Sequence, residues 1–86
     1  MAEYAKFYLI KNKDPEINNS YLISVKEGKT HRTIRDYSYS RKGLNITFDE
    51  IDNYEIVYFK TVKYGSGYEL KTIKNYYIKN LNLNGL

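Results

Sequence analysis

Apolar and polar residues alternate with a period of two along much of this chain, and this pattern restricts its fold more than any other feature. The clearest case is the segment Tyr4–Ile10, where Ala5, Phe7 and Leu9 share one side of an extended chain. Successive side chains of a strand point to opposite faces of its sheet. No helical repeat longer than two turns stands out, so the pattern predicts a β-dominated fold.

A second strand is predicted after a loop. Residues Asn12–Asn19 contain an Asp-Pro pair, and proline restricts the residue before it and lacks an amide donor, which indicates a loop. Residues Ser20–Lys26 are rich in β-branched and aromatic residues. We expect Tyr21, Ile23 and Val25 to point inward from this strand.

A tight turn is predicted at Glu27-Gly28, because glycine tolerates the positive φ that hairpin turns require. Residues Lys29–Arg35 would then pair back as a third strand. The following run, Asp36–Gly43, has no apolar pattern and is expected to be an exposed loop. Residues Leu44–Ile46 can form a short strand.

A short helix is predicted from Thr47. Thr47 and Glu50 have the spacing of a capping box, in which the hydroxyl and the carboxylate each satisfy a free amide at a helix start. The acids in this first turn, Asp49 and Glu50, also suit the helix dipole. The helix must end by about Asn53, because the residues that follow are again β-branched and aromatic.

The last third of the chain predicts a hairpin. Two β-rich runs, Glu55–Lys63 and Tyr68–Lys79, flank Gly65 and Gly67. Asn80–Leu86 alternates asparagine and leucine and is expected to be a loose tail or a short edge segment.

The predicted fold is therefore a single α+β domain over residues 1–86. About five strands form a small antiparallel sheet, with one short helix between the third and fourth strands. An oligonucleotide-binding barrel has the same order of elements, so a small barrel is the alternative to an open twisted sheet.

Composition excludes several classes of protein. The chain has 86 residues and no cysteine, so neither disulfides nor thiolate metal sites are possible. No apolar run approaches the ~20 residues that span a bilayer, and the first residues lack the order of a signal peptide. We expect a cytoplasmic protein with no membrane contact and no cofactor.

Two clusters invite a catalytic or metal-binding interpretation. The acidic residues around Asp49–Glu55 lack the spacing of a calcium loop, and helix capping plus a solvated surface accounts for them. The best catalytic candidates are His31, Arg32, Arg35, Tyr37 and Tyr39, a set of residue types with which a small ribonuclease can work. In such a site cations stabilise charge and other groups move protons. A lone histidine in a basic exposed segment is more often a surface residue, so we expect no enzymatic activity and no metal.

Tyrosine and lysine supply the candidate binding surface. The chain has eleven tyrosines and a net charge of +4, and its charges run basic, acidic, basic along the sequence. Residue usage that follows AT-rich codons can explain the number of tyrosines but not their positions. Tyrosine rings next to cations can stack on bases beside a phosphate backbone.

Twelve residues form the predicted site. Seven lie in the basic, tyrosine-bearing segment Lys29–Lys42: Lys29, Arg32, Arg35, Tyr37, Tyr39, Arg41 and Lys42. Five lie in outward rows of two strands that extend the surface if the strands are neighbours: Tyr4, Lys6, Tyr8, Tyr58 and Lys60. The structural alternative for the rows is that the tyrosines pair across strands and cover a thin sheet.

Two functions fit this site. The first is a non-enzymatic protein that binds nucleic acid or a nucleoprotein complex. The second is an inhibitor of the type found in phages and mobile elements, such as an anti-defence protein, which blocks a host protein that itself binds nucleic acid. Exposed strand edges also make a homodimer possible.

Overall fold

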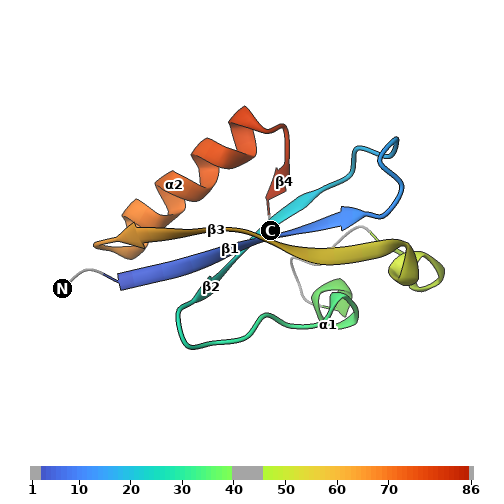
Figure 1. Ribbon diagram of the computed structural model, residues 1–86, viewed down its shortest axis with the longest axis horizontal. Helices are drawn as coiled ribbons and strands as arrows, with labels where there is room; N and C mark the ends of the chain where they lie inside the picture. Colours follow the sequence, from blue (N-terminus) through green and yellow to red (C-terminus); the bar gives the residue numbers. More distant parts are fainter. Residues whose placement is uncertain (1–2, 40–45, 86) are drawn as a thin grey trace.

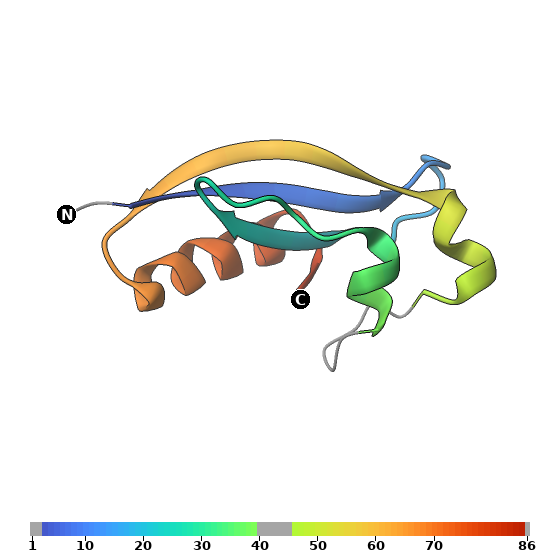
Figure 2. The same ribbon diagram turned by 90° about the horizontal axis from the view of Figure 1, so that it is seen from below.

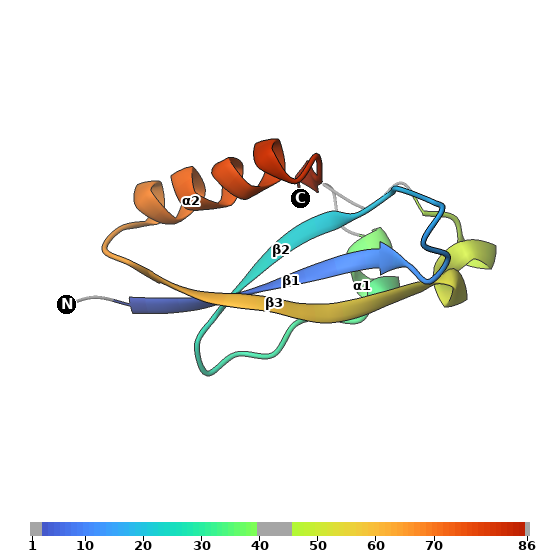
Figure 3. The same cartoon turned by 45° about the horizontal axis from the view of Figure 1, so that its top comes forward.

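The computed structural model describes residues 3–39 and 46–85 and shows a twisted sheet with helices on both faces (Figure 1). Three antiparallel strands form the sheet: β1 (Glu3–Asn12), β2 (Tyr21–Lys26) and β3 (Tyr54–Tyr64). A two-residue strand, β4 (Asn84–Gly85), pairs in parallel with β2. The strand order is β3-β1-β2-β4, so β3 lies at an edge of the sheet (Figure 3).

The helices cover opposite faces of this sheet. The long helix α2 (Gly67–Asn80) runs back over one face, as Figure 1 shows. The short helix α1 (Ile34–Tyr39) and the 3-10 helix η1 (Phe48–Asn53) lie on the other side, which is turned toward the reader in Figure 2.

Alternation in β1 assigns its side chains to these two faces. The Phe7 ring contacts Tyr77 of α2 edge-on, with ring centroids 6.0 Å apart. The odd-numbered residues of β1 therefore lie on the face that α2 covers, the α2 face. Ile10 packs in a cluster with Ile34 of α1, so the even-numbered residues lie on the opposite face, the α1 face.

Each face has its own buried contacts. On the α1 face the buried members of the core cluster are Ile10, Tyr21, Ile23, Ile46 and Tyr54. On the α2 face Ala5, Phe7 and Leu22 are completely buried. The strand over Ser20–Lys26 and the burial of Tyr21, Ile23 and Val25 confirm the sequence prediction. Burial of apolar surface on both faces is what a thin sheet needs to be stable.

The predicted five-stranded sheet with a helix between its third and fourth strands is wrong, and so is the small barrel. The turn at Gly28 forms as expected, with a φ of 87° and a hydrogen bond from the Lys29 amide to the Lys26 carbonyl. The chain beyond it does not pair back as a strand. It enters α1 instead, where the Thr33 hydroxyl accepts the Asp36 amide at 3.2 Å.

The predicted C-terminal hairpin is also wrong, because residues 67–80 form α2. The Ser66 hydroxyl accepts the Glu69 amide at 3.2 Å, and the Glu69 carboxylate accepts the Gly65 amide at 3.1 Å. These two bonds cap the helix start much as a capping box does, although the carboxylate accepts the amide of the residue before the N-cap Ser66. Leu70, Ile73 and Tyr77 then follow at helical spacing and face the sheet.

The capping box predicted at Thr47 does not form. The Thr47 side chain caps no amide of η1, and its hydroxyl instead bonds the Asp49 carboxylate, which lowers the pKa of Asp49. The Glu50 amide bonds the Thr47 backbone carbonyl at 2.9 Å. The helical segment ends at Asn53, as predicted.

A β-bulge in β3 changes which side chains share a face. Phe7 of β1 pairs with Lys60, and the next residue, Tyr8, pairs with Tyr58, so Phe59 is the extra residue. In a regular strand Tyr58 and Lys60 would point to the same face, because they are two residues apart. The bulge instead places Tyr58 on the α1 face and Lys60 on the α2 face.

Candidate nucleic-acid interface

The α1 face is only partly covered by helices. Ile34 and Tyr37 of α1 and Ile51 of η1 pack over the end of the sheet where Ile10 lies. Toward the start of β1 and the end of β3 the side chains are more open. We call the six residues of this open part the Tyr/Lys ladder: Tyr4, Lys6, Tyr8, Tyr58, Thr61 and Lys63.

The strand register brings the ladder residues together in three pairs. Three residues of β1 lie directly opposite three residues of β3: Tyr4 opposite Lys63, Lys6 opposite Thr61, and Tyr8 opposite Tyr58. Opposite residues of an antiparallel pair have their Cβ atoms about 4.5–5.5 Å apart. Lys63 of β3 and Lys6 of β1 are therefore diagonal neighbours across the two strands. They lie between the rings of Tyr4 and Tyr58, which are 44% and 57% exposed.

Tyr58 is held in a defined position on this surface. Its hydroxyl hydrogen-bonds the Thr61 hydroxyl at 2.7 Å, on the same strand. The edge-to-face contact with Tyr8, at 5.9 Å between ring centroids, supports the ring from the neighbouring strand. The ring thus lies along β3 and keeps more than half of its surface open to solvent. A ring fixed in this way loses little conformational entropy when a ligand stacks on it.

Tyr8 connects the ladder to the segment after β2. Its ring meets the His31 ring edge-on, with centroids 4.8 Å apart. Tyr58, Tyr8 and His31 therefore form a row of three rings across the α1 face. This contact brings the start of the basic segment Lys29–Lys42 beside the ladder.

The basic segment is only partly a loop. Lys29, Arg32 and Arg35 are exposed, and Arg35 lies on α1. Tyr37 is half-buried against the core cluster, and its hydroxyl accepts the Arg32 amide at 3.2 Å. These contacts give Tyr37 a structural role that sequence patterning did not indicate. Tyr39 ends α1, while Arg41 and Lys42 lie outside the described residues.

Lys60 does not belong to the ladder. The half-buried Lys60 ammonium donates to the Tyr77 hydroxyl at 2.6 Å on the α2 face. It lies 4.6 Å from the centroid of the Tyr77 ring and 5.6 Å from that of Phe59, both within cation–π range. The register instead places Lys63 and Thr61 in the ladder, opposite Tyr4 and Lys6. The sequence analysis missed these two residues because the bulge, which sets the face on which they lie, cannot be seen in the sequence.

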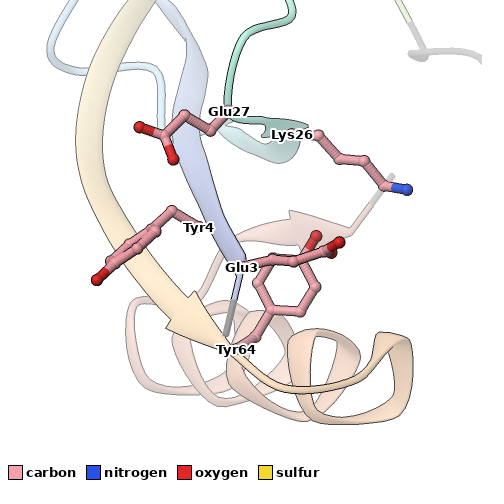
Figure 4. A pocket seen from close by; sticks show the side chains of 5 residues that line it. All are labelled: Glu3, Tyr4, Lys26, Glu27 and Tyr64. Atoms are coloured by element: carbon pink, nitrogen blue, oxygen red, sulfur yellow. The ribbon is translucent and has the colours of Figure 1, made fainter. Parts of the chain in front are cut away.

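One acidic residue limits the ladder at the Tyr4 end. A hollow at this corner is lined by Glu3, Tyr4, Lys26, Glu27 and Tyr64 (Figure 4). Tyr4 and Glu27 point to one side of β1, and the other three side chains point to the other side. Because its lining diverges in this way, the hollow is not a pocket for one small ligand. Glu27 instead adds a negative charge beside Tyr4.

Tyr64 stabilises the same corner of the sheet, where β1 starts and β3 ends, on the α2 face. The ring is buried, and its hydroxyl hydrogen-bonds the Glu3 carboxylate. This bond, together with desolvation and the charge of Glu3, raises the pKa of Tyr64 above its ordinary value. The neutral hydroxyl is the form that can donate to the carboxylate, so the contact fastens the start of β1 to the end of β3.

The described part of the chain has no cluster of side chains that could hold a metal ion. Nowhere in residues 3–39 and 46–85 do three His, Asp or Glu side chains gather as they would around an ion. The His31 Nδ1 atom lies 2.9 Å from the Arg32 carbonyl oxygen, and the ring packs on Tyr8. His31 therefore supports the aromatic row.

Comparison with family models, with curated proteins and with solved structures finds no match to this chain. Within the described residues, no helix is long and apolar enough to cross a membrane.

Proposed function

We propose that the chain is a non-enzymatic protein that binds nucleic acid, free or within a nucleoprotein complex, through the Tyr/Lys ladder and the basic segment Lys29–Lys42. The observation that carries the proposal is the exposed Tyr58 ring, fixed by Thr61 and Tyr8 on a surface that carries two lysines on its Tyr4 side. Stacking of a base on such a ring contributes about 1–3 kcal/mol and needs an unpaired base. The expected ligand is therefore single-stranded.

Charge supports the same ligand. Lys6 and Lys63 lie on the Tyr4 side of the Tyr58 ring. The exposed Lys29, Arg32 and Arg35 belong to the segment that the His31–Tyr8 contact brings beside the ladder. Cations along this path can neutralise successive phosphates and release counterions. Glu27 opposes phosphate binding at the Tyr4 end, so the strongest contact is expected between Tyr58 and His31.

The proposal is tested by fluorescence anisotropy with labelled single-stranded DNA, single-stranded RNA and duplex DNA over a range of salt concentrations. We expect single strands to bind more tightly than the duplex, with a salt dependence corresponding to roughly two to five released counterions. Equal or tighter binding of the duplex would contradict the stacking mechanism, and no binding at low salt would contradict the proposal.

A matched pair of double variants localises the charge. Lys6→Gln with Lys63→Gln removes two ladder cations, whereas Lys11→Gln with Lys79→Gln removes two exposed cations outside the ladder. Because each neutralised phosphate contributes about 0.7 to the slope of log K against log salt for single strands, the ladder variant should lower this slope by about 1.4. The control should leave the slope nearly unchanged.

A second candidate function is supported by two exposed tyrosines of α2. Tyr68 and Tyr76 are 83% and 61% exposed and lie outside the ladder. Tyrosine rings give contact area at low entropic cost in protein interfaces. A phage-type or mobile-element inhibitor that blocks a host protein would use such a surface. It would capture one protein stoichiometrically after nuclease treatment and lose it when Tyr68 and Tyr76 are changed to alanine.

A further inference from the structure

The outer edge of β3 is an unused pairing surface. In the described part of the chain no strand pairs with β3 on the side away from β1. Every second residue of an edge strand directs its backbone amide and carbonyl outward, where they can bind another extended chain. β3 is also the longest strand, with 11 residues, so it offers a long template.

Helix α2 turns part of this edge into a groove. Residues 60–63 of β3 form one wall, and Thr72, Ile73, Tyr76 and Tyr77 of α2 form the other. The space between them has a volume of about 580 Å³. A strand that pairs with β3 here would place alternate side chains against the apolar parts of Ile73 and Tyr76.

The charges of the groove are positive. Lys60 and Lys63 line it, and no acidic side chain does. Tyr77 and Phe59 hold the Lys60 ammonium in place, and Tyr77 accepts one of its three N–H donors. A carboxylate in the groove would complete the coordination of this ammonium through a charge-assisted hydrogen bond.

The same charges disfavour a second copy of the chain as the occupant. If two copies paired antiparallel through residues 60–63, the Lys60 and Lys63 side chains of both copies would gather along one seam, and residues 56–64 supply no acidic side chain to offset them. The repulsion between these like charges disfavours such a pair.

We infer that the groove between β3 and α2 binds an extended acidic peptide, which adds a strand to the edge of β3 and places a carboxylate at Lys60. Backbone pairing supplies affinity, and the lysines and apolar wall supply specificity. This binding requires neither of the functions proposed above. Thr61 and Lys63 belong to both surfaces, so variants of α2 alone separate the groove from the ladder.

The test uses a fluorescein-labelled eight-residue peptide of alternating glutamate and valine, titrated with the full chain. Tyr76→Ala removes a groove side chain that is largely exposed, so it should preserve the fold, and Tyr68→Ala on the same helix is the matched control. We expect Tyr76→Ala to weaken peptide binding about five- to tenfold and Tyr68→Ala to leave it unchanged. Binding of single-stranded DNA should be the same for both variants.

Two further peptides test the mode of binding. A peptide with lysine in place of glutamate should not bind, and one with alternate backbone amides methylated should bind at least tenfold more weakly because it cannot pair with β3. Equal binding of either peptide would overturn the inference, as would failure of the glutamate peptide to bind. A homodimer in sedimentation that Tyr76→Ala dissociates would overturn it too, because a second copy would then occupy the groove.

Discussion

The two halves of the α1 face share one backbone geometry and differ in what covers them. At one end, helices α1 and η1 bury Ile10 and Tyr54 in a packed cluster, where the Tyr54 hydroxyl accepts a hydrogen bond from the Asn19 side chain at 2.8 Å. At the other end, Tyr4 and Tyr58 stand exposed beside lysines. The covered half stabilises the fold and the open half can bind a ligand, so a tyrosine's role in this protein follows from its position in the sheet.

The largest expected effect lies in the covered half. Ile10 is completely buried in the central strand. Ile10→Ala should reduce the free energy of unfolding by about 2–5 kcal/mol, because it removes apolar contacts and leaves a cavity. Urea denaturation followed by circular dichroism measures this loss. A loss below about 1 kcal/mol would show that the cluster around Ile10 is not the main core.

The next effect lies in the open half. Tyr58→Ala should weaken binding of single-stranded nucleic acid about 5- to 150-fold, since it removes the stacking ring. The free energy of unfolding should change by less than about 1 kcal/mol, because the residue is mostly exposed. Anisotropy and urea denaturation on the same sample give both numbers. If Tyr58→Ala destabilised the fold as much as Ile10→Ala, the contrast between the two halves would fail.

A smaller effect tests how Tyr58 is positioned. Thr61→Val keeps the shape of the side chain but removes the hydroxyl that bonds Tyr58. We expect a two- to fivefold loss of affinity, on the order of the cost of ordering one side chain on binding. Thr72→Val, which removes an exposed hydroxyl on α2, is the control. Identical affinities for both variants would show that the hydrogen bond does not prepare the ring.

The smallest effect concerns a tyrosine outside both halves. The pKa of Tyr64 is raised by its hydrogen bond to Glu3, so the folded state favours the neutral hydroxyl. This contribution to stability is present below the unfolded-state pKa of about 10 and is lost as the pH rises through the folded-state pKa. Glu3→Gln should bring the Tyr64 pKa back toward its ordinary value. Carbon-13 NMR of labelled tyrosine rings would show no difference between the two proteins if the bond were absent.

The three long strands could be predicted from the sequence because their local pattern and their environment agree. In Tyr4–Ile10 and Ser20–Lys26, residues that favour strands occur in a period-two pattern. These two segments pair with each other in the sheet, so the environment supports the local preference. The predicted strand Glu55–Lys63 is confirmed within β3 for the same reason.

The long helix could not be predicted from residue preferences alone. Residues 68–79 are rich in tyrosine, isoleucine and threonine, which favour strands, and the glycines before them suggested a hairpin. Two signals for a helix were nevertheless present. Ser66 and Glu69 have capping-box spacing, and Leu70, Ile73 and Tyr77 form a stripe at helical period. The tertiary contact of Tyr77 with Phe7 and Phe59 then favours the helix over a strand.

The candidate site was predicted in part. Tyr4, Lys6, Tyr8 and Tyr58 do lie together, because β1 and β3 are neighbours. Lys60 was expected beside Tyr58 and lies on the opposite face, because one extra residue in a strand reverses the alternation that follows it. A bulge depends on how two strands pair, so it is not visible in either strand's own sequence.

The most direct test of the account is a nitrogen-15 NMR titration of the chain with an eight-nucleotide single-stranded oligonucleotide. We predict amide shifts that concentrate on Lys6, Tyr8, Tyr58, Thr61 and Lys63 and extend to His31, with little change in Ile10, Ile23 and Tyr54 of the covered half. Shifts confined to α2, or no shifts at low salt, would contradict the assignment of the Tyr/Lys ladder as a nucleic-acid interface.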